Sequence, residues 1–355
     1  MLLLRALFFL NSLVGGGAER VCLNLARQLY QLNIESDFIT IYNRQPDYEI
    51  PDYIHVFSLA IANKTGEWIE VIKAVPKVNI FLSDKKYVLI TAHVQPSHLL
   101  ASLTKVGNKS LYVVHSVVEY GSWREKLFYK LFYKNKKIVA VSKGVEDEWK
   151  QEYGLRSEDV ATIYNPGGIS YLKSKPQFGL PHSRPYILVM GRLVDEKNPL
   201  LALELYYRGQ FYQQYDLIFL GKGFLEGCLK EQIIKYDMQE HVFLMGFQKN
   251  PAQWLMHASL LLSCSKKEGL PMNLIEALGF GIPVVAADCP CGPNEILTDE
   301  LAKYLIHPEQ DQNESISIIS SALVTYPAIT KQYYEKFEDG LIAETYLKTW
   351  KHNFG

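Results

Sequence analysis

Residues 259–288 form the stretch SLLLSCSKKEGLPMNLIEALGFGIPVVAAD, and this stretch decides the fold. An apolar run at 259–264 leads through a glycine-containing loop into a helical segment that begins near Pro271. Proline suits the first helical position because its φ is already fixed there. A second apolar run follows at 282–288. Strand, helix and strand in this order predict a parallel α/β unit with a ligand site at the carboxyl end of the first strand.

Two glutamates flank the predicted start of this helix. Free backbone amides and the positive end of the helix dipole favour phosphate oxygens there, and Gly269, Leu270 and Met272 would shape the cradle. Glu268 stands at the mouth, whereas Glu276 lies eight residues further on and could accept hydrogen bonds from ribose hydroxyls. The alternative is that Glu268 only caps the helix and Glu276 is a solvated helix residue.

Two cations follow another predicted strand. The segment ILVMGRLVDEKNP at 187–199 places Arg192 and Lys197 after an apolar run, where open α/β sheets bind their ligands. Arginine grips two phosphate oxygens in a fixed fork, and lysine acts as a mobile point charge, so the pair could neutralise a diphosphate. The alternative is that both are surface cations paired with Asp195 and Glu196.

The same alternation of apolar runs and helix-like segments extends over the whole chain and predicts two parallel-sheet halves. Strands are predicted at 4–10, 37–42, 53–58, 87–92, 110–115 and 137–141, and then at 186–191, 216–221, 242–247, 259–264 and 282–288. Glycines, prolines and lysines at 166–185 indicate a linker without regular structure. We therefore predict an amino-terminal domain at 1–166, a carboxyl-terminal domain at 184–330 and a closing helix at 331–355.

The first half offers a glycine loop and two histidines. Gly15, Gly16 and Gly17 separate the first predicted strand from a helix, and their amides could bind an anion. The GxGxxG dinucleotide fingerprint fails because Arg20 replaces its third glycine; a tight turn without a ligand is the alternative. His93 and His115 close two consecutive predicted strands, where an imidazole could hydrogen-bond a ligand or move protons.

Composition excludes several classes of protein. With 37 basic and 38 acidic residues among 355, no whole-molecule field attracts nucleic acid. The five cysteines are odd in number and lack CxxC spacing, which favours a reducing cytoplasm. The opening MLLLRALFFLNSLV has the length of a buried strand and leads into the glycine loop, so we interpret it as a strand and not as a signal peptide. No window approaches the length of a membrane span.

A basic and aromatic segment suggests a membrane-facing surface. WREKLFYKLFYKNKK at 123–137 is predicted to place four lysines along one helical face, namely Lys126, Lys130, Lys134 and Lys137. Such a face suits an anionic bilayer surface. The alternative is a helix whose apolar side packs on the first sheet while its lysines are merely solvated. The acidic run 146–148 is interpreted as a solvated helix face and not as a metal site.

The motifs GGGAER, VVHS, GRLVDEKN and EGLPMNLIE, followed by GIPVVAADCPCGPNEIL, together resemble glycosyltransferase family 4, whose members have the GT-B architecture. The resemblance implies an α/β protein of two Rossmann-like domains facing each other across a cleft, with the carboxyl-terminal helix crossing back to the first domain. It assigns Glu268 to the donor sugar, Glu276 to the ribose, Arg192 and Lys197 to the diphosphate, and His115 to the active site. The remaining donor-binding positions are Gly15, Gly16, Gly17, Phe247 at the nucleobase, Gly269, Leu270, Pro271, Met272 and Asn273.

The resemblance also implies a reaction. We expect a metal-independent, retaining transfer of a hexose or N-acetylhexosamine from a nucleotide diphosphate sugar, with UDP as the expected nucleotide, and no cofactor. The acceptor would be a glycan or a polyprenyl- or other lipid-linked saccharide in bacterial surface polysaccharide or glycolipid synthesis. The enzyme would be cytoplasmic and peripheral on the inner face of the membrane. The alternatives are a nucleotide-sugar epimerase of GT-B fold and a non-catalytic partner subunit.

Overall fold

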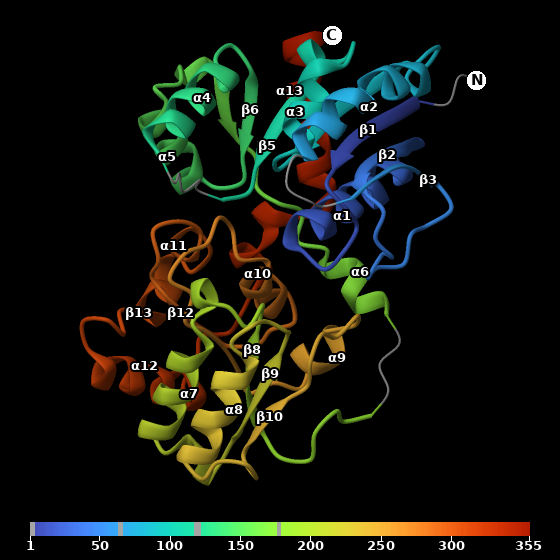
Figure 1. The fold of residues 1–355 in the computed structure, drawn as a ribbon. Coiled ribbons are helices and arrows are strands. Elements are labelled where there is room, and N and C mark those ends of the chain that lie inside the picture. The colour runs from blue at the N-terminus through green and yellow to red at the C-terminus, as the bar shows by residue number, and fades with distance from the viewer. Residues whose placement is uncertain (1–3, 63–66, 117–121, 176–178) are drawn as a thin grey trace. The chain divides into compact units, whose positions relative to one another are not determined.

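The chain divides into two compact units, each built around its own parallel sheet (Figure 1). The computed structural model describes residues 4–62, 67–116, 122–175 and 179–355. The first unit takes in Met1–Pro166 and Phe337–Gly355, and the second takes in Gly167–Lys336. Residues 176–178 of the predicted linker lie outside the described residues.

The described residues of the first unit form a seven-stranded sheet in the order β3-β2-β1-β4-β5-β6-β7, and each of these neighbouring pairs is parallel. Its strands are β1 (Leu4–Leu10), β2 (Ile34–Tyr42), β3 (Ile54–Ile61), β4 (Tyr87–His93), β5 (Leu111–Val114), β6 (Lys137–Ala140) and β7 (Val160–Thr162). The six strands predicted for this half are confirmed. β7 was not predicted because its three residues are too few to show a pattern.

Helices flank this sheet and include one from the far end of the chain. They are α1 (Gly17–Gln31), α2 (Glu67–Phe81), α3 (Ser97–Leu103), α4 (Trp123–Tyr133), α5 (Lys143–Tyr153) and α13 (Asp339–Phe354), with 3-10 helices η1 (Gly107–Lys109) and η2 (Ser157–Asp159). α1 buries Val21, Leu25 and Leu29, which repeat every four residues and so form one apolar face. α13 packs against α1 and β4, which confirms that the closing helix belongs to the first unit.

The second unit repeats the plan with a six-stranded parallel sheet in the order β10-β9-β8-β11-β12-β13. Its strands are β8 (Tyr186–Met190), β9 (Asp216–Leu220), β10 (Val242–Leu244), β11 (Leu260–Ser263), β12 (Val284–Ala287) and β13 (Leu305–Ile306). Its helices are α6 (Ile169–Ser174), α7 (Pro199–Arg208), α8 (Glu226–Lys235), α9 (Ala252–Leu255), α10 (Met272–Gly279), α11 (Pro293–Ile296) and α12 (Gln312–Val324). The 3-10 helices are η3 (Asp195–Lys197), η4 (Phe211–Gln213), η5 (Asp299–Tyr304), η6 (Lys331–Tyr333) and η7 (Glu335–Phe337). The five strands predicted here are confirmed, and the two-residue β13 is an addition.

Three sequence-based predictions are wrong in detail. The segment 166–185 is not without regular structure, because Gly168 adopts a left-handed conformation and starts α6, which buries Leu172. The segment 331–355 is not one helix: two 3-10 turns precede α13, which begins at Asp339. Glu146 in the acidic run is not solvated, since it is buried on α5 and binds Lys143, Lys150 and Thr162.

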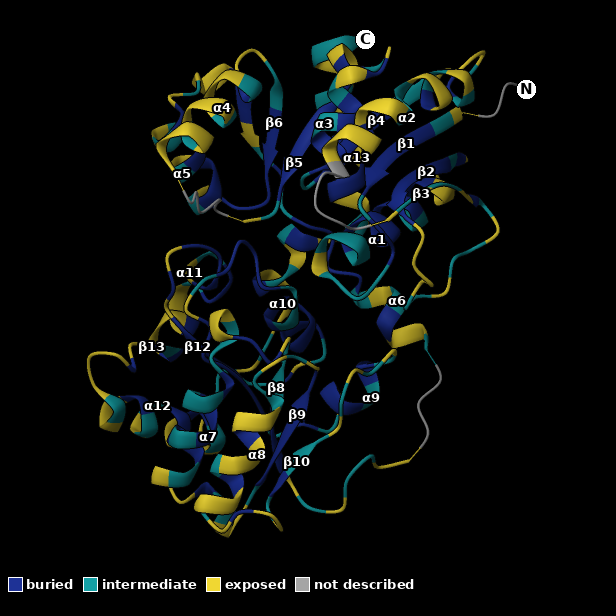
Figure 2. Cartoon of the chain, viewed as in Figure 1, coloured by how far each residue is buried: buried dark blue, intermediate teal, exposed yellow. Residues whose placement is uncertain are grey.

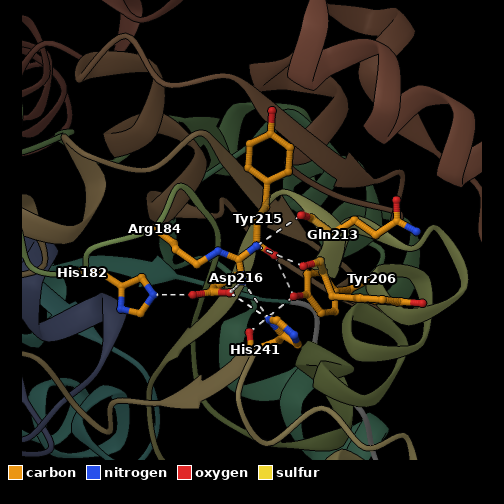
Figure 3. A network of polar contacts seen from close by, with 8 residues as sticks. His182, Arg184, Tyr206, Gln213, Tyr215, Asp216 and His241 are labelled. Carbon is orange, nitrogen blue, oxygen red and sulfur yellow. Dashed lines mark hydrogen bonds and ion pairs between the residues drawn. The ribbon is translucent and has the colours of Figure 1, made fainter.

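A buried carboxylate joins three strands at the amino-terminal edge of the second sheet (Figure 3). Asp216 begins β9 and is 2% exposed. Arg184 Nη1 lies 2.7 Å from its Oδ1, His182 Nε2 lies 2.6 Å from its Oδ2, and His241 Nδ1 lies 3.3 Å from Oδ1. His182 and Arg184 precede β8, and His241 precedes β10. The network therefore ties the entry into β8 to the starts of β9 and β10, at the edge opposite the loops described next.

Candidate active site

Each sheet changes its winding direction beside its first strand. In the second unit β8 lies between β9 and β11, and in the first unit β1 lies between β2 and β4. Loops that leave the carboxyl ends of such strands diverge and leave a crevice for ligands. The predicted donor residues Arg192 and Lys197 follow β8, and Glu268 follows β11. The switch point of the second sheet thus lies between the two motifs that carry the prediction.

Lys197 and Glu268 form an ion pair between these two loops. Glu268 is 8% exposed and Lys197 is about a quarter exposed at its side chain. The backbone amide of Lys266 also donates to the carbonyl of Glu196 at 2.8 Å, which ties η3 to the loop after β11. In the described part of the chain neither Asp195 nor Glu196 forms an ion pair with Lys197, so that alternative is wrong for this lysine.

The start of α10 differs slightly from the prediction. Pro271 is the residue before the helix, with extended backbone angles, and Met272 is the first helical residue. Pro271, the residue before the helix, forms no side-chain cap, and in the described part of the chain the Glu268 carboxylate binds Lys197 and not the helix end. Gly292, at φ +95°, packs against the turn formed by Gly269 and Pro271. A side chain at Gly292 would overlap that turn, so the loop after β12 supports it from behind.

Glu276 and Asn273 lie on α10 itself. Glu276 has no exposed surface, so it is not a solvated helix residue. Burying a carboxylate costs free energy unless polar groups or a ligand form hydrogen bonds with it. Glu276 is therefore a candidate for binding a ligand. The Asn273 amide donates to the Met190 carbonyl at 2.8 Å. Asn273 therefore fastens α10 to the carboxyl end of β8, a positioning contact that the sequence pattern did not reveal.

Arg192 lies in a loop that is joined to the one after β9. The Leu193 amide donates to the Lys222 carbonyl at 3.0 Å, and a Cβ at Gly221 would overlap the Gly191 carbonyl oxygen. Arg192 is exposed and forms no ion pair within the described residues. Sequence reasoning missed Lys222, an exposed cation between Gly221 and Gly223 at the same sheet edge. The signal was a lysine between two glycines directly after a predicted strand.

Phe247 occupies the loop after β10 at the same edge of the sheet. It is 38% exposed, as an aromatic side chain that could stack on a base would be. The amide of Gly221 donates to the carbonyl of Gly246 at 2.9 Å, which ties this loop to the one after β9. The predicted nucleobase residue is therefore two strands away from β8, and its loop is connected to the Arg192 loop through β9.

In the first unit the predicted glycine loop begins α1. Gly15 has φ +25°, Gly16 precedes the helix and Gly17 is its first residue. The Glu19 carboxylate folds back over Gly16, where it leaves no room for a Cβ. Burial raises the pKa of Glu19 above its ordinary value. Tyr48 donates from its hydroxyl to the Gly16 carbonyl at 3.3 Å, so the loop is held from outside the turn.

The two histidines singled out in the sequence contact each other. His93 Nδ1 and His115 Nε2 are 2.9 Å apart. His93 has no exposed surface, whereas His115 is partly exposed. Burial lowers the pKa of His115 to about 4 and, with help from the neighbouring His115, lowers that of His93 well below its usual value. Both imidazoles are therefore neutral near pH 7.

Helix α4 carries two of the four lysines of the predicted membrane face, Lys126 and Lys130. It ends at Tyr133, so Lys134 is the residue just after the helix, and Lys137 begins β6, where it pairs with Asp159 at 3.0 Å. Lys126 pairs with Glu152 on α5 at 2.6 Å. Part of the helix packs on the first unit, since Tyr133 is buried and Phe132 contacts the ring of Tyr112 on β5. Four large apolar side chains are nevertheless between 48% and 71% exposed, namely Trp123, Leu127, Phe128 and Leu131. Figure 2 shows this helix as largely exposed.

Three further findings concern metals, cysteines and membranes. Over residues 4–62, 67–116, 122–175 and 179–355 no group of three or more His, Cys, Asp or Glu side chains is arranged to hold a metal ion. The five cysteines are free thiols, and Cys228 is exposed. Among the same residues no helix combines the length and apolarity that crossing a bilayer requires.

The chain is similar to known glycosyltransferases over most of its length. The family model "Glycosyltransferase Family 4" matches residues 15–166, and "Glycosyl transferases group 1" matches 171–328. An uncharacterised glycosyltransferase of Methanocaldococcus jannaschii is 29% identical over 295 residues, covering 75% of this chain and 72% of that protein. The N-acetylgalactosamine-N,N'-diacetylbacillosaminyl-diphospho-undecaprenol 4-alpha-N-acetylgalactosaminyltransferase of Campylobacter jejuni is 25% identical over 326 residues, covering 86% of each chain.

Solved structures agree in fold. Anabaena HepE, solved in complex with UDP and glucose, superimposes with a TM-score of 0.68 over 97% of this chain and 99% of that one, at 19% identity. At that identity the likeness shows the architecture alone, two parallel-sheet Rossmann-like domains of the GT-B type. The family models and the motifs at β8 and β11 agree with it, so the chain belongs to glycosyltransferase family 4.

Proposed function

We propose that the protein is a retaining glycosyltransferase that moves a hexose or N-acetylhexosamine from a UDP-sugar to a glycan or lipid-linked saccharide. The observation that carries the proposal is the meeting of Lys197, Glu268 and the start of α10 at one switch point. The Lys197 ammonium and the positive end of the α10 dipole suit a diphosphate, and the Glu268 carboxylate at the same sheet edge suits the hydroxyls of a sugar attached to it.

The comparisons support the donor and the acceptor classes. The neighbour HepE binds UDP and glucose, and the Campylobacter relative is named for transfer to a saccharide on diphospho-undecaprenol. That relative is also named for an alpha linkage. A role in the synthesis of surface polysaccharide or glycolipid follows from the same likeness. The free thiols are in keeping with a cytoplasmic enzyme.

In this proposal the bound donor replaces the ion pair between Lys197 and Glu268. Lys197 leaves the Glu268 carboxylate for the phosphate oxygens, and Glu268 then accepts hydrogen bonds from the sugar hydroxyls. Glu276, buried further along α10, binds the ribose hydroxyls. Arg192 and the first amides of α10 complete the charge balance on the diphosphate. The pair thus keeps both charges satisfied until the donor replaces each partner.

The chemical step follows from where charge appears. The acceptor oxygen bonds to the anomeric carbon on the face from which the phosphate oxygen departs, and the acceptor proton passes to that phosphate oxygen. The anomeric configuration is retained. Negative charge grows on the leaving diphosphate as its bond to carbon breaks, and Lys197 and Arg192 stabilise that charge. We propose that these cations serve in place of a metal ion, so that chelation of divalent metals leaves activity unchanged.

Helix α4 supports a further part of the proposal, peripheral attachment to an anionic membrane on its cytoplasmic face. Leu127, Phe128 and Leu131 are exposed on it, and Lys130 and, just after the helix, Lys134 are exposed as well. Apolar groups that enter the headgroup region together with lysines that meet anionic lipids give this type of binding. A lipid-linked acceptor would then be presented to the enzyme at the same surface.

The decisive experiment separates transfer from its alternatives. A thermal-shift screen of nucleotide sugars first identifies the donor, because a ligand of the folded state raises the melting temperature. The donor is then incubated with and without extracted lipid-linked saccharides, in the presence of EDTA. We expect a glycosylated product only when acceptor is present. A new free nucleotide sugar in the donor-only reaction would indicate an epimerase, and binding without any product would indicate a non-catalytic subunit.

A further inference from the structure

Three side chains form a line that ends at the carboxyl edge of the first sheet. Thr91 and His93 are two residues apart on β4 and therefore lie on the same face of the strand. Both have no exposed surface. Thr91 Oγ1 is 3.0 Å from His93 Nε2, and His93 Nδ1 is 2.9 Å from His115 Nε2. His115 follows β5 and is the only member of the three that reaches the surface.

The two strand ends that carry the histidines are fixed by another histidine. His98 Nε2 lies 3.0 Å from the Ala92 carbonyl and 3.1 Å from the Val113 carbonyl, so it donates to both strands. Its Nδ1 accepts from the Tyr133 hydroxyl at 2.7 Å. The ring of His93 also stacks on Phe8 of β1, with ring centres 6.2 Å apart. The ends of β4 and β5 and the ring of His93 are therefore fixed in place.

The available donors and acceptors determine which ring nitrogen of His93 carries its hydrogen. A neutral His93 carries one N–H and shares both ring nitrogens with neighbours. If Nε2 carried the hydrogen, it would donate to Thr91, whose own hydroxyl hydrogen would have no acceptor among the described residues. If Thr91 donates instead, His93 carries its hydrogen on Nδ1 and donates to His115. Only this second order satisfies every buried group, and an unmade buried hydrogen bond is costly.

We propose that Thr91 and His93 form a buried donor chain that holds His115 in its Nδ1–H tautomer. His115 then offers the substrate a hydrogen-bond donor and not a base. Thr91 and His93 are positioning residues, because they act only through His115. The functional part of this inference rests on the proposed function, in which His115 contacts an oxygen of the donor or the acceptor. The tautomer itself does not depend on that role.

The chain also opposes a positive charge on His115. An imidazolium has N–H groups on both nitrogens, so Nε2–H of His115 would face Nδ1–H of His93. Relief would require His93 to move its hydrogen to Nε2, which leaves the Thr91 hydroxyl hydrogen without an acceptor. The low pKa of His115 is in keeping with this arrangement. The other titratable group beside the rings is His98, which would disfavour a cation on His93 if charged; its own pKa is lowered to about 3 by burial, and Lys136 lowers it in the same direction.

The tautomer can be measured directly. The intact protein, labelled with ¹⁵N only in histidine, is examined by two-dimensional NMR of the ring nitrogens, and the His115 signals are assigned by their loss in His115→Asn. We expect a protonated Nδ1 and an unprotonated Nε2 on His115 at pH 7, with the same pattern on His93. A protonated Nε2 on His115 in the wild-type protein would overturn the assignment.

A matched pair of variants tests the role of the hydroxyl. Thr91→Val removes the first donor without changing the shape, and Thr40→Val makes the same change at a buried site on β2 outside the chain. We expect Thr91→Val to allow both His115 tautomers. It should lower kcat on the order of tenfold and change KM much less. It should also move the acid limb of the kcat–pH profile to higher pH. Thr91→Ser should restore all three, and Thr40→Val should alter none.

The outcomes separate this inference from the proposed function. An unchanged His115 tautomer and pH profile in Thr91→Val would overturn the donor chain even if the enzyme is a transferase. Full activity of His115→Ala, with the wild-type tautomer observed, would instead overturn the assigned contact between His115 and substrate. Loss of activity in His115→Ala together with the Nδ1–H form in the wild type supports both.

Discussion

At the scale of single residues, the candidate site depends on charges that satisfy one another. Glu268 is nearly buried, and a buried carboxylate is tolerated when a cation such as Lys197 lies against it. The same two groups are chemically suited to the two ends of a diphosphate sugar. A pair that can exchange each partner for ligand atoms lets the donor bind without leaving a buried charge uncompensated.

Alanine variants should separate binding from turnover. Lys197→Ala should lower kcat on the order of a hundredfold, because its charge matters most as the leaving diphosphate becomes more negative. Glu276→Ala should mainly weaken donor binding, by about 2 kcal/mol, because it removes ribose hydrogen bonds. Steady-state kinetics and donor titrations measure the two effects. Lys235→Ala, at an exposed lysine on α8, is the control. Full activity in both site variants would contradict the assigned roles.

At the scale of elements, close loop packing builds the site. The loops after β8 and β9 approach so closely that Gly221 has no room for a side chain, and its φ of +150° is open only to glycine. The loops after β11 and β12 meet in the same way at Gly292. At both glycines one loop lies with its backbone directly against the backbone of the next. Gly221 therefore supports the loop of Arg192, and Gly292 supports the loop of Glu268.

Replacing Gly221 should therefore disturb the site through the backbone. Gly221→Ala should destabilise the second unit by about 2 kcal/mol or more and weaken donor binding. Gly227→Ala is the matched control, because Gly227 lies on α8 with open space around its Cα and an alanine there should stabilise by about 0.5–1 kcal/mol. Thermal unfolding with and without UDP measures both. Equal melting temperatures for the two variants would refute the packing argument.

Helix α4 gives the second prediction at this scale. Lys130→Glu combined with Lys134→Glu should weaken binding to phosphatidylglycerol vesicles by at least about 2 kcal/mol, or roughly thirtyfold, since each lysine near an anionic surface contributes about 1 kcal/mol. Lys126 is left unchanged because it pairs with Glu152. Lys235→Glu with Lys351→Glu makes the same charge change on other helices and should have no such effect. If sedimentation with these vesicles is the same for all proteins, α4 does not bind membranes.

At the scale of the whole molecule, each unit repeats one plan. A central first strand has neighbours on both sides, and loops that carry predicted site residues leave its carboxyl end and that of the strand across the switch point. Net charge is close to zero, so charged ligands are met by local groups and not by a general field. The first unit adds three histidines whose pKa values are lowered, His93, His98 and His115, and we expect these to make its stability depend on pH.

Acidification should destabilise the first unit before carboxylates titrate. Burial lowers the pKa of His98 to about 3 and that of His115 to about 4, and His93 shifts in the same direction. The unfolded chain, with ordinary histidine pKa values near 6.5, therefore binds more protons than the folded one, and stability falls as pH drops below about 6.5. The loss is up to about 1.4 kcal/mol per histidine for each pH unit.

This prediction is checked by thermal unfolding between pH 6.5 and pH 5, a range above the ordinary titration of carboxylates. We expect the melting temperature to fall steadily across it. His115→Asn should have a shallower slope, because one buried titrating group is gone. A melting temperature that stays level over this range in the wild-type protein would show that the histidines are not held neutral by the fold.

The sequence by itself determined the elements and the residue types of the site. Apolar runs such as 4–10 and the glycine and proline punctuation of 259–288 are local signals, and the structure has the strands there. Short or packing-dependent elements such as β7 and α6 escaped prediction, since their stability comes from neighbours and not from pattern. Glu268 and Lys197 were both selected from sequence, but the fact that they bind each other was not.

Only the tertiary structure decided the strand order, and with it which loops meet. β8 and β11 are separated by some seventy positions in sequence yet are neighbours in the sheet, and likewise His93 meets His115 only because β4 pairs with β5. Hydrophobic period and turn chemistry act over a few residues, whereas strand pairing depends on the burial of the whole sheet. The residue types of the candidate site could therefore be predicted from the sequence, whereas their arrangement in space is set by the tertiary structure.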